Sequence, residues 1–193
     1  MAQGVKVLGL AGSLRAGSYN KKLVQIALGG AKAAGAEVTF VELRDLALPI
    51  YDEDLEKSGG LPAGALRLKE LMTAHHGLLV ASPEYNSSVS AALKNAIDWA
   101  SRPAPNETSL QCFKGRVAGL VAASPGALGG LRGLVHLRAI LGNLGVIVLP
   151  EQLAIAKAHE AIGVDGRMVD PKQQQAVEAI GAAVAKTAAK LNA

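Results

Sequence analysis

Apolar residues recur along the chain with two periods, one typical of strands and one typical of helices. Short apolar runs of the length expected for buried strands occupy residues 5–10, 37–43, 77–81, 117–123 and 146–149. Between and after them, apolar residues follow helical spacing over 20–34, 62–75, 90–101 and 131–144. Asp170 and Pro171 open a last helix, as N-cap and first-turn proline. The pattern therefore predicts strands that alternate with helices.

This alternation favours an α/β fold built on one open, doubly wound parallel sheet. Right-handed crossovers over a chain of this length fit the strand order 2-1-3-4-5. No linker or repeat interrupts the pattern, so residues 1–193 are expected to form a single domain. Segment 44–60 is expected to be an irregular acidic loop, longer than most such connections and therefore a candidate binding or interface loop. Irregular structure is also expected at 102–114 and 150–169.

The loop after the first strand, GLAGSLRAGSYN, has the composition of a phosphate-binding turn. Its glycines allow backbone N–H groups to converge on an anion, and the next helix adds a favourable dipole. A Walker A triplet and the dinucleotide fingerprint are both absent. A loop rich in Ser and Asn, with one Arg, suits a terminal monophosphate better than a buried pyrophosphate. An ordinary turn capped by Ser18 or Asn20 is the alternative. The candidate phosphate ligands are Ser13, Arg15, Ser18 and Asn20.

Two further polar loops, SPEYNSS and SPGALGG, follow the third and fourth strands. In a sheet of this order, ligands bind outside the carboxyl ends of the strands, where the strand order reverses. Pro83 and Tyr85 suit a flat heteroaromatic ring, and Asn86 supplies hydrogen-bond donors. A phosphate at the first loop and a ring at the other two describe a mononucleotide, above all a flavin. The alternative is a proline-initiated turn in which Ser88 or Ser90 caps the next helix.

Charge and composition narrow the class of protein. The 20 Lys and Arg residues exceed the 16 Asp and Glu residues, but they are spread along the chain without the patches of nucleic-acid binding. A net charge of +4 suits small anionic ligands. The lone Cys112 excludes an internal disulfide and fits a reducing compartment. The N-terminus has no signal-peptide layout, and no apolar run approaches the ~20 residues that span a bilayer. A cytoplasmic protein is therefore expected, with neither nucleic acid nor membrane as partner.

The motifs GSLRAGSYN and SPEYNSSVSAALKNAIDW, in this order, resemble those of the NADPH-dependent FMN reductase family, in its chromate/quinone reductase branch. The likeness covers nearly the whole chain, including LALPIYDEDLE and SPGALGG. It implies a flavodoxin-like three-layer sandwich that binds FMN and takes NADPH or NADH as co-substrate. It also implies a role for each motif residue: Ser13, Arg15, Ser18, Tyr19 and Asn20 around the phosphate, Pro83, Glu84, Tyr85 and Asn86 along the isoalloxazine ring, and Ser124 and Gly126 near its other edge.

The resemblance further implies an activity and an assembly. Hydride passes from the nicotinamide to FMN and then to a quinone, with chromate or ferric complexes as further acceptors, so no separate acid or nucleophile is expected. Members are typically homodimers or homotetramers with the flavin near a subunit interface, which accounts for the acidic loop 45–56. Tyr85 and Arg102 are candidates for contact with the acceptor. Capping of its own helix is an equal alternative for Arg102.

Other classes of protein fit less well. An electron-transfer flavodoxin, without an NAD(P)H site of its own, is usually strongly acidic, whereas this chain is basic. A hydrolase or transferase that uses Ser13 or Ser87 needs a G-x-S-x-G elbow and a Ser/His/acid set, which the sequence lacks. His136 and His159 have no partners at metal-ligand spacing, so no metal site is expected.

Overall fold

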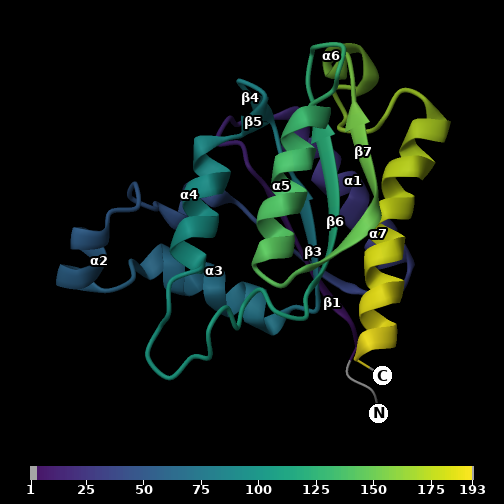
Figure 1. Cartoon of the computed structure of the whole chain (residues 1–193). Helices are drawn as coiled ribbons and strands as arrows, with labels where there is room; N and C mark the ends of the chain where they lie inside the picture. The colour runs from purple at the N-terminus through teal and green to yellow at the C-terminus, as the bar shows by residue number, and fades with distance from the viewer. Residues whose placement is uncertain (1–3, 193) are drawn as a thin grey trace.

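A computed structural model describes residues 4–192 as a parallel sheet with helices on both faces (Figure 1). The sheet strands are β1 (Lys6–Ala11), β2 (Glu37–Val41), β3 (Gly77–Ala81), β6 (Val117–Ala123) and β7 (Ile147–Ile155), and β4 (Glu84–Tyr85) pairs with β5 (Ser88–Val89) as a hairpin. The helices are α1 (Tyr19–Ala33), α2 (Glu53–Gly59), α3 (Ala63–Ala74), α4 (Ala91–Ala100), α5 (Leu131–Asn143), α6 (Ala158–Ala161) and α7 (Pro171–Leu191), with a 3-10 turn η1 (Leu43–Leu46). Over this part of the chain, no helix is long and apolar enough to cross a membrane.

Hydrogen bonds arrange the five parallel strands in the order β2-β1-β3-β6-β7. Counted along the main sheet, this is the predicted order 2-1-3-4-5, so the α/β fold class is confirmed. The central strands β3 and β6 are buried along their whole length, because helices cover both of their faces. Strand order reverses between β1 and β3, so the loops that follow these two strands leave the sheet side by side.

Helices cover both faces of the sheet (Figure 1), and one apolar layer on each face joins them to it. On one face, α1 and α7 pack on the strands and on each other, with Leu23 and Val184 fully buried. A Cβ atom at Gly181 would lie 1.8 Å from the carbonyl oxygen of Ala27, so this close helix contact requires glycine. On the other face, α3, α4 and α5 enclose a second core that includes Phe113.

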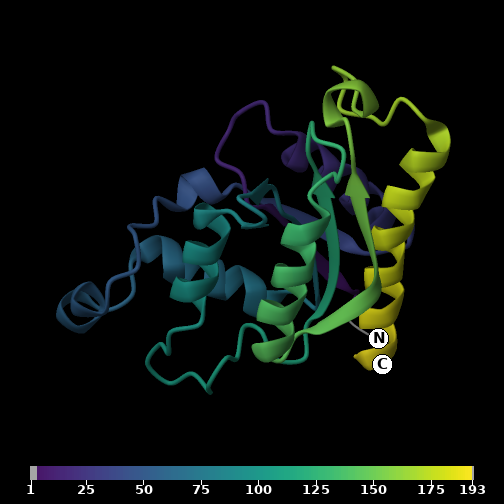
Figure 2. The same cartoon turned by 45° about the horizontal axis from the view of Figure 1, so that its top comes forward.

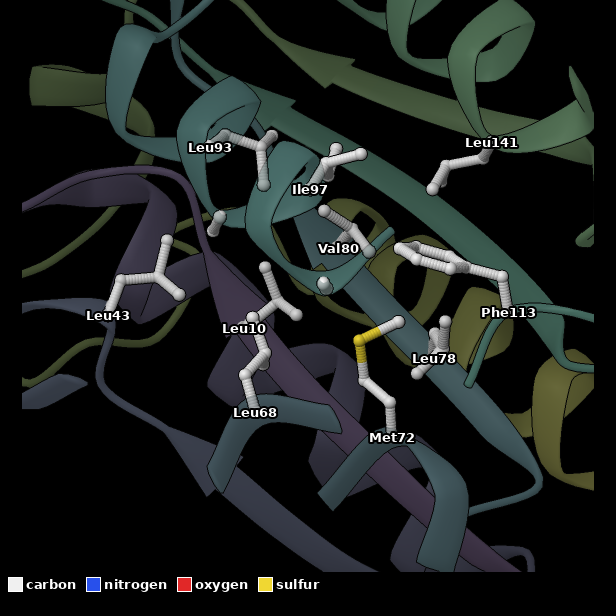
Figure 3. Close-up of a pocket in the computed structure, with 12 residues that line it drawn as sticks. Leu10, Leu43, Leu68, Met72, Leu78, Val80, Leu93, Ile97, Phe113 and Leu141 are labelled. Atoms are coloured by element: carbon white, nitrogen blue, oxygen red, sulfur yellow. The ribbon is translucent and has the colours of Figure 1, made fainter. Parts of the chain in front are cut away.

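The second core contains a hollow with only apolar walls (Figure 3). Leu10 and Val80 reach it from the strands, Met72 from α3 and Ile97 from α4, and the ring of Phe113 closes one side. None of the side chains that line it can donate or accept a strong hydrogen bond, so it offers nothing to a phosphate or to a ring nitrogen. The hollow is therefore a packing feature of the core.

Segment 44–60 is more ordered than the irregular loop that the sequence predicts. It contains the end of η1 and the short helix α2, which stands away from the body at the left of Figures 1 and 2. The side chain of Asp52 caps α2 by accepting from the N–H of Asp54, and acidic residues in the first turn favour the helix dipole. Because α2 has no buried residue, its sequence lacks the apolar periodicity from which the longer helices are predicted.

The last strand is also longer than the predicted run 146–149. β7 continues through Pro150, and its pairing with β6 shifts register between Ala118 and Leu120. The extra β7 residues form a bulge, and β7 lies at the edge of the sheet. The N–H that proline lacks is therefore not needed for a hydrogen bond to a neighbouring strand. The following segment, expected to be irregular, contains the short helix α6 and an isolated β-bridge.

Candidate functional site

Three loops meet at the carboxyl edge of the sheet and enclose a pocket. They follow β1, β3 and β6, which lie next to one another in the sheet. The pocket has a cavity volume of about 70 Å³ and continues into open solvent. Of the predicted cofactor residues, all except Asn86 and Gly126 line it. The lining consists of Ser13, Arg15, Ser18, Tyr19, Asn20, Pro83, Glu84, Tyr85, Ala123, Ser124 and Pro125.

One end of the pocket is formed by the N-terminus of α1. Ser18 is the N-cap of this helix, and its Oγ accepts a hydrogen bond from the N–H of Lys21 at 3.4 Å, which leaves the hydroxyl proton available for a ligand. Ser13 is buried and lines the same pocket, and Arg15 is exposed at its rim. First-turn N–H groups, two hydroxyls and a guanidinium are all donors, a set that suits an anion such as phosphate.

Asn20 connects the first loop to the third. Its buried amide donates to the carbonyl oxygen of Ala123 at 2.8 Å and accepts from the N–H of the same residue at 3.0 Å. Both ends of the amide are therefore engaged with the end of β6. Asn20 lines the pocket as predicted, but its side chain holds the start of α1 against the sheet edge.

Ser90 connects the first loop to the second. Its Oγ caps α4 by accepting from the N–H of Leu93 at 3.2 Å, and its hydroxyl donates to the carbonyl oxygen of Gly12 at 2.5 Å. Gly12 permits this approach, since a Cβ atom there would lie only 2.8 Å from the Cβ of Leu93. Ser90 therefore caps the next helix, as in the alternative interpretation of this loop, and the pocket is present as well.

The second loop folds as a hairpin, a conformation that the sequence did not predict. Asn86 and Ser87 join β4 to β5 with φ values of 50° and 67°, and a type I′ turn requires positive φ at both central residues. Tyr85 is 53% exposed and lines the pocket, so its ring is accessible to a planar ligand. Asn86 faces an adjoining groove that also includes His136.

Glu84 is directed toward α5. Its Oε1 accepts from Arg132 Nε at 2.8 Å, and its Oε2 accepts from the N–H of Gly133 at 3.1 Å. Burial raises the pKa of Glu84, but the hydrogen bonds from Gly133 and Arg132 and the Arg132 charge outweigh it and hold that pKa below its ordinary value. The ionised carboxylate thus joins the second loop to α5. Arg132 could not be singled out from the sequence, because no motif marks a contact between residues 48 positions apart.

Arg102 lies away from the pocket. It follows the C-terminus of α4, a helix of 10 residues that is about 15 Å long. The other end of this helix, near Ser90, is the one close to the pocket. Its guanidinium lies over the ring of Tyr51, 5.4 Å from the centroid, and its carbonyl oxygen accepts from Lys69 Nζ at 2.7 Å. These contacts anchor the loop after α4. Contact between Arg102 and an acceptor stays a prediction.

Two features outside the pocket bear on its chemistry, the thiol of Cys112 and the distribution of possible metal ligands. Burial raises the pKa of Cys112 to about 11, so this thiol is protonated at neutral pH. Within residues 4–192, no group of three His, Cys, Asp or Glu side chains could hold a metal ion.

The pocket lining fits the two ends of FMN. A phosphate dianion finds only donors at the start of α1, and the carboxylate of Glu84 is already paired with Arg132. A flat ring finds Pro83 and the exposed Tyr85 at the hairpin. The donors and the aromatic wall come from loops that Asn20 and Ser90 hold together.

Known proteins resemble this chain over most of its length. The sequence pattern of the NADPH-dependent FMN reductases matches residues 5–160. An NAD(P)H-dependent FMN reductase of Pseudomonas aeruginosa is 39% identical over 180 residues, which cover 92% of each chain. A quinone reductase of Escherichia coli K12 is 34% identical over 181 residues, which cover 92% of this chain and 88% of that one.

A solved structure agrees with the sequence matches. FerB, a flavoenzyme NAD(P)H:(acceptor) oxidoreductase from Paracoccus denitrificans, has a TM-score of 0.80 and 31% identity, over 96% of this chain and 98% of that one. The matched family is FMN-dependent and uses NAD(P)H, so the expected cofactor and co-substrate are confirmed. On sequence and structure together, the chain belongs to the NADPH-dependent FMN reductase family.

Proposed function

We propose that this chain is an FMN-dependent NAD(P)H:quinone oxidoreductase in which residues 1–193 act as one FMN-binding domain. The observation that carries the proposal is the pocket where the strand order reverses, because it joins the donors of the first loop to the aromatic wall of the second. Similarity to the quinone reductase of E. coli supports the acceptor class, and similarity to the P. aeruginosa enzyme supports the reductant.

The phosphate of FMN is assigned to the N-terminus of α1. Ser13 and Ser18 donate hydroxyl hydrogen bonds, and Arg15 supplies a charged contact from the rim. Tyr19 and Asn20 present backbone N–H groups of the first helical turn, which have no partner within the helix. Binding at this end selects the phosphorylated flavin over riboflavin.

The ring is assigned to the space between the second and third loops. When bound, FMN supplies the hydride chemistry that links nicotinamide and quinone. The chain binds and orients the ring and excludes water, so no acid or nucleophile is assigned. Tyr85 also lines the adjoining groove and is assigned a contact with the acceptor. The residues assigned to the ring are Pro83, Glu84, Tyr85, Asn86, Ser124 and Gly126.

The proposal extends to acceptor range, location and assembly. Chromate and ferric complexes are further acceptors, because a net charge of +4 attracts anions. A reducing cytoplasm suits the free thiol of Cys112. A homodimer or homotetramer is proposed because α2 has no buried residue while Ile50 beside it is 77% exposed, and short isolated helices are marginal in water.

Steady-state turnover of the holoenzyme tests the proposed activity. The protein loaded with FMN should oxidise NADPH or NADH rapidly when a soluble benzoquinone is present, with one quinone reduced for each nucleotide oxidised. An electron-transfer flavodoxin, the alternative class, would bind FMN but would not accept hydride from NAD(P)H. Tight FMN binding without quinone-dependent NAD(P)H oxidation would therefore refute the enzyme and favour the carrier.

The substitution Arg15→Ala is expected to weaken FMN binding about tenfold or more and to leave riboflavin binding nearly unchanged, since a hydrogen bond to a charged group contributes about 1.5–3 kcal/mol. Fluorescence titration of the flavin-free protein with each ligand measures both affinities. Arg67→Ala removes an exposed arginine on α3 and should bind both flavins like the unmodified protein. Equal losses for the two ligands would contradict the phosphate contact.

A further inference from the structure

The hairpin that carries Tyr85 is attached to α5 at two points, on neighbouring turns of that helix. At the first, Arg132 Nε and Nη2 lie 2.8 and 2.6 Å from Oε1 of Glu84, and the N–H of Gly133 donates to Oε2. At the second, Nδ1 of His136 lies 2.9 Å from Oγ of Ser88. Each strand of the hairpin is therefore tied to the same helix.

Gly133 lets the hairpin lie close to α5. A Cβ atom at this position would be 3.3 Å from the carbonyl oxygen of Ser88, so the hairpin would have to shift by a few tenths of an ångström, and it would be in ordinary contact with the Cβ of Glu84 at 3.4 Å. The same helix begins directly after the third pocket loop, with Gly130 as its N-cap at a φ of 97°. The N-terminal end of α5 therefore continues the third loop and also holds the second loop in place.

The ion pair between Glu84 and Arg132 is unequal in burial. The side chain of Glu84 is 8% exposed and that of Arg132 is 57% exposed. A surface pair contributes little to stability, but a buried carboxylate that loses its cation is left uncompensated. The position of the hairpin therefore depends strongly on Arg132, although the side chain of this arginine is exposed.

We propose that Glu84, Arg132 and Gly133 form a clamp that positions Tyr85 and the third loop against the isoalloxazine ring, which makes Arg132 a positioning residue of the reaction. The inference rests on the proposed function, since it requires a flavin ring at the hairpin. Arg132 is outside the pocket lining, so its effect passes through Glu84. The clamp serves the ring end of the pocket, whereas Arg15 and Ser18 serve the phosphate end.

Titration with FMN and with riboflavin distinguishes a defect at the ring end of the pocket from a defect at the phosphate end. Arg132→Ala should weaken the binding of FMN and of riboflavin by the same factor, about tenfold, because a charge-assisted hydrogen bond to a buried carboxylate is lost. Arg15→Ala should weaken FMN binding alone. Arg138→Ala is the matched control, since it removes the same charge from the same helix while its contacts go to Gln152 and Pro150. Its flavin affinities should change by less than about twofold.

Steady-state kinetics of the holoenzyme at saturating FMN give a second measurement. A loss of stability alone would not change kcat of the folded enzyme loaded with FMN. A misplaced ring impairs hydride transfer more than quinone capture, so Arg132→Ala should lower kcat about tenfold with KM for a benzoquinone nearly unchanged. Arg132→Lys keeps the charge without the planar fork and should be intermediate. Gly133→Ala changes no charge but requires a small shift of the hairpin, and should cause the same two defects, in flavin binding and in kcat, to a smaller extent.

The outcomes distinguish the clamp from the function on which it rests. Unchanged flavin affinity and kcat in Arg132→Ala, with an intact thermal transition, would overturn the clamp and leave the oxidoreductase proposal standing. Equal flavin losses in Arg138→Ala would also overturn it, because the effect would then belong to α5 in general. If Arg132→Ala does not fold, Arg132→Lys and Gly133→Ala decide the question. Failure of the unmodified protein to bind either flavin would instead refute the proposed function.

Discussion

Replacing Trp99 with alanine is expected to lower the free energy of unfolding by about 3–5 kcal/mol, as for other large buried aromatic side chains. Trp99 is fully buried on α4. Its ring meets that of Tyr51 edge-on, with 5.0 Å between centroids, and its Nε1 donates to the carbonyl oxygen of Pro49 at 2.8 Å. The substitution leaves a cavity and also releases the segment that leads into α2.

The variant Trp99→Phe is the control for this prediction. It keeps an aromatic ring in the core and loses mainly the Nε1 hydrogen bond, so we expect a loss of about 1–2 kcal/mol. Urea unfolding followed by far-ultraviolet circular dichroism measures both variants, because Trp99 is the only tryptophan and its fluorescence disappears with it. A loss below about 1 kcal/mol for Trp99→Ala would show that the core collapses around the missing ring.

The substitution Asn20→Ala is expected to destabilise the protein by about 3 kcal/mol, because a buried N–H and a buried carbonyl of Ala123 both lose their partner and each costs about 1–3 kcal/mol. It also separates the start of α1 from the third loop. We therefore expect weaker binding of both FMN and riboflavin, in contrast to the selective effect of Arg15→Ala.

Asn143→Ala is the matched control, since Asn143 is an exposed residue in the last turn of α5. It should change the free energy of unfolding by less than about 0.5 kcal/mol and leave flavin binding unaltered. Denaturant titration and flavin fluorescence measure the two effects separately. If Asn20→Ala binds riboflavin as tightly as the unmodified protein does, the amide stabilises the fold without shaping the ring end of the pocket.

The strand pattern and the three polar loops could be predicted from the sequence because their signals are local. A parallel strand buried on both faces must be continuously apolar, as in 117–123, and the loop after it must then be polar. Right-handed crossovers over a chain of this length fit the order 2-1-3-4-5, so the loops after the first, third and fourth strands were expected to meet. The pocket lining agrees with this expectation for Ser13, Ser18 and Tyr85.

Helix α2 and the end of β7 were missed because their stability does not depend on a buried stripe. α2 is stabilised by the Asp52 cap and by charge at its first turn, and neither produces apolar periodicity. β7 passes through Pro150, which normally ends a strand, because an edge position and a bulge tolerate the missing N–H. In β7 the local rule was overridden by position in the fold, whereas in α2 the local signals are a cap and charges, not an apolar pattern.

The sequence by itself determined the fold class and which loops carry polar side chains, since each depends on the composition of short stretches, and the strand order was then predicted from the rules for crossover connections. Only the tertiary structure decided what those side chains do. Asn20 meets Ala123 across 103 positions, and Glu84 meets Gly133 across 49. These partners are brought together by the packing of α1 and α5 on opposite faces of the sheet, and no local pattern encodes a contact at such separation. Asn20 and Glu84, which the sequence predicted as ligands, therefore connect the pocket loops to one another and to α5.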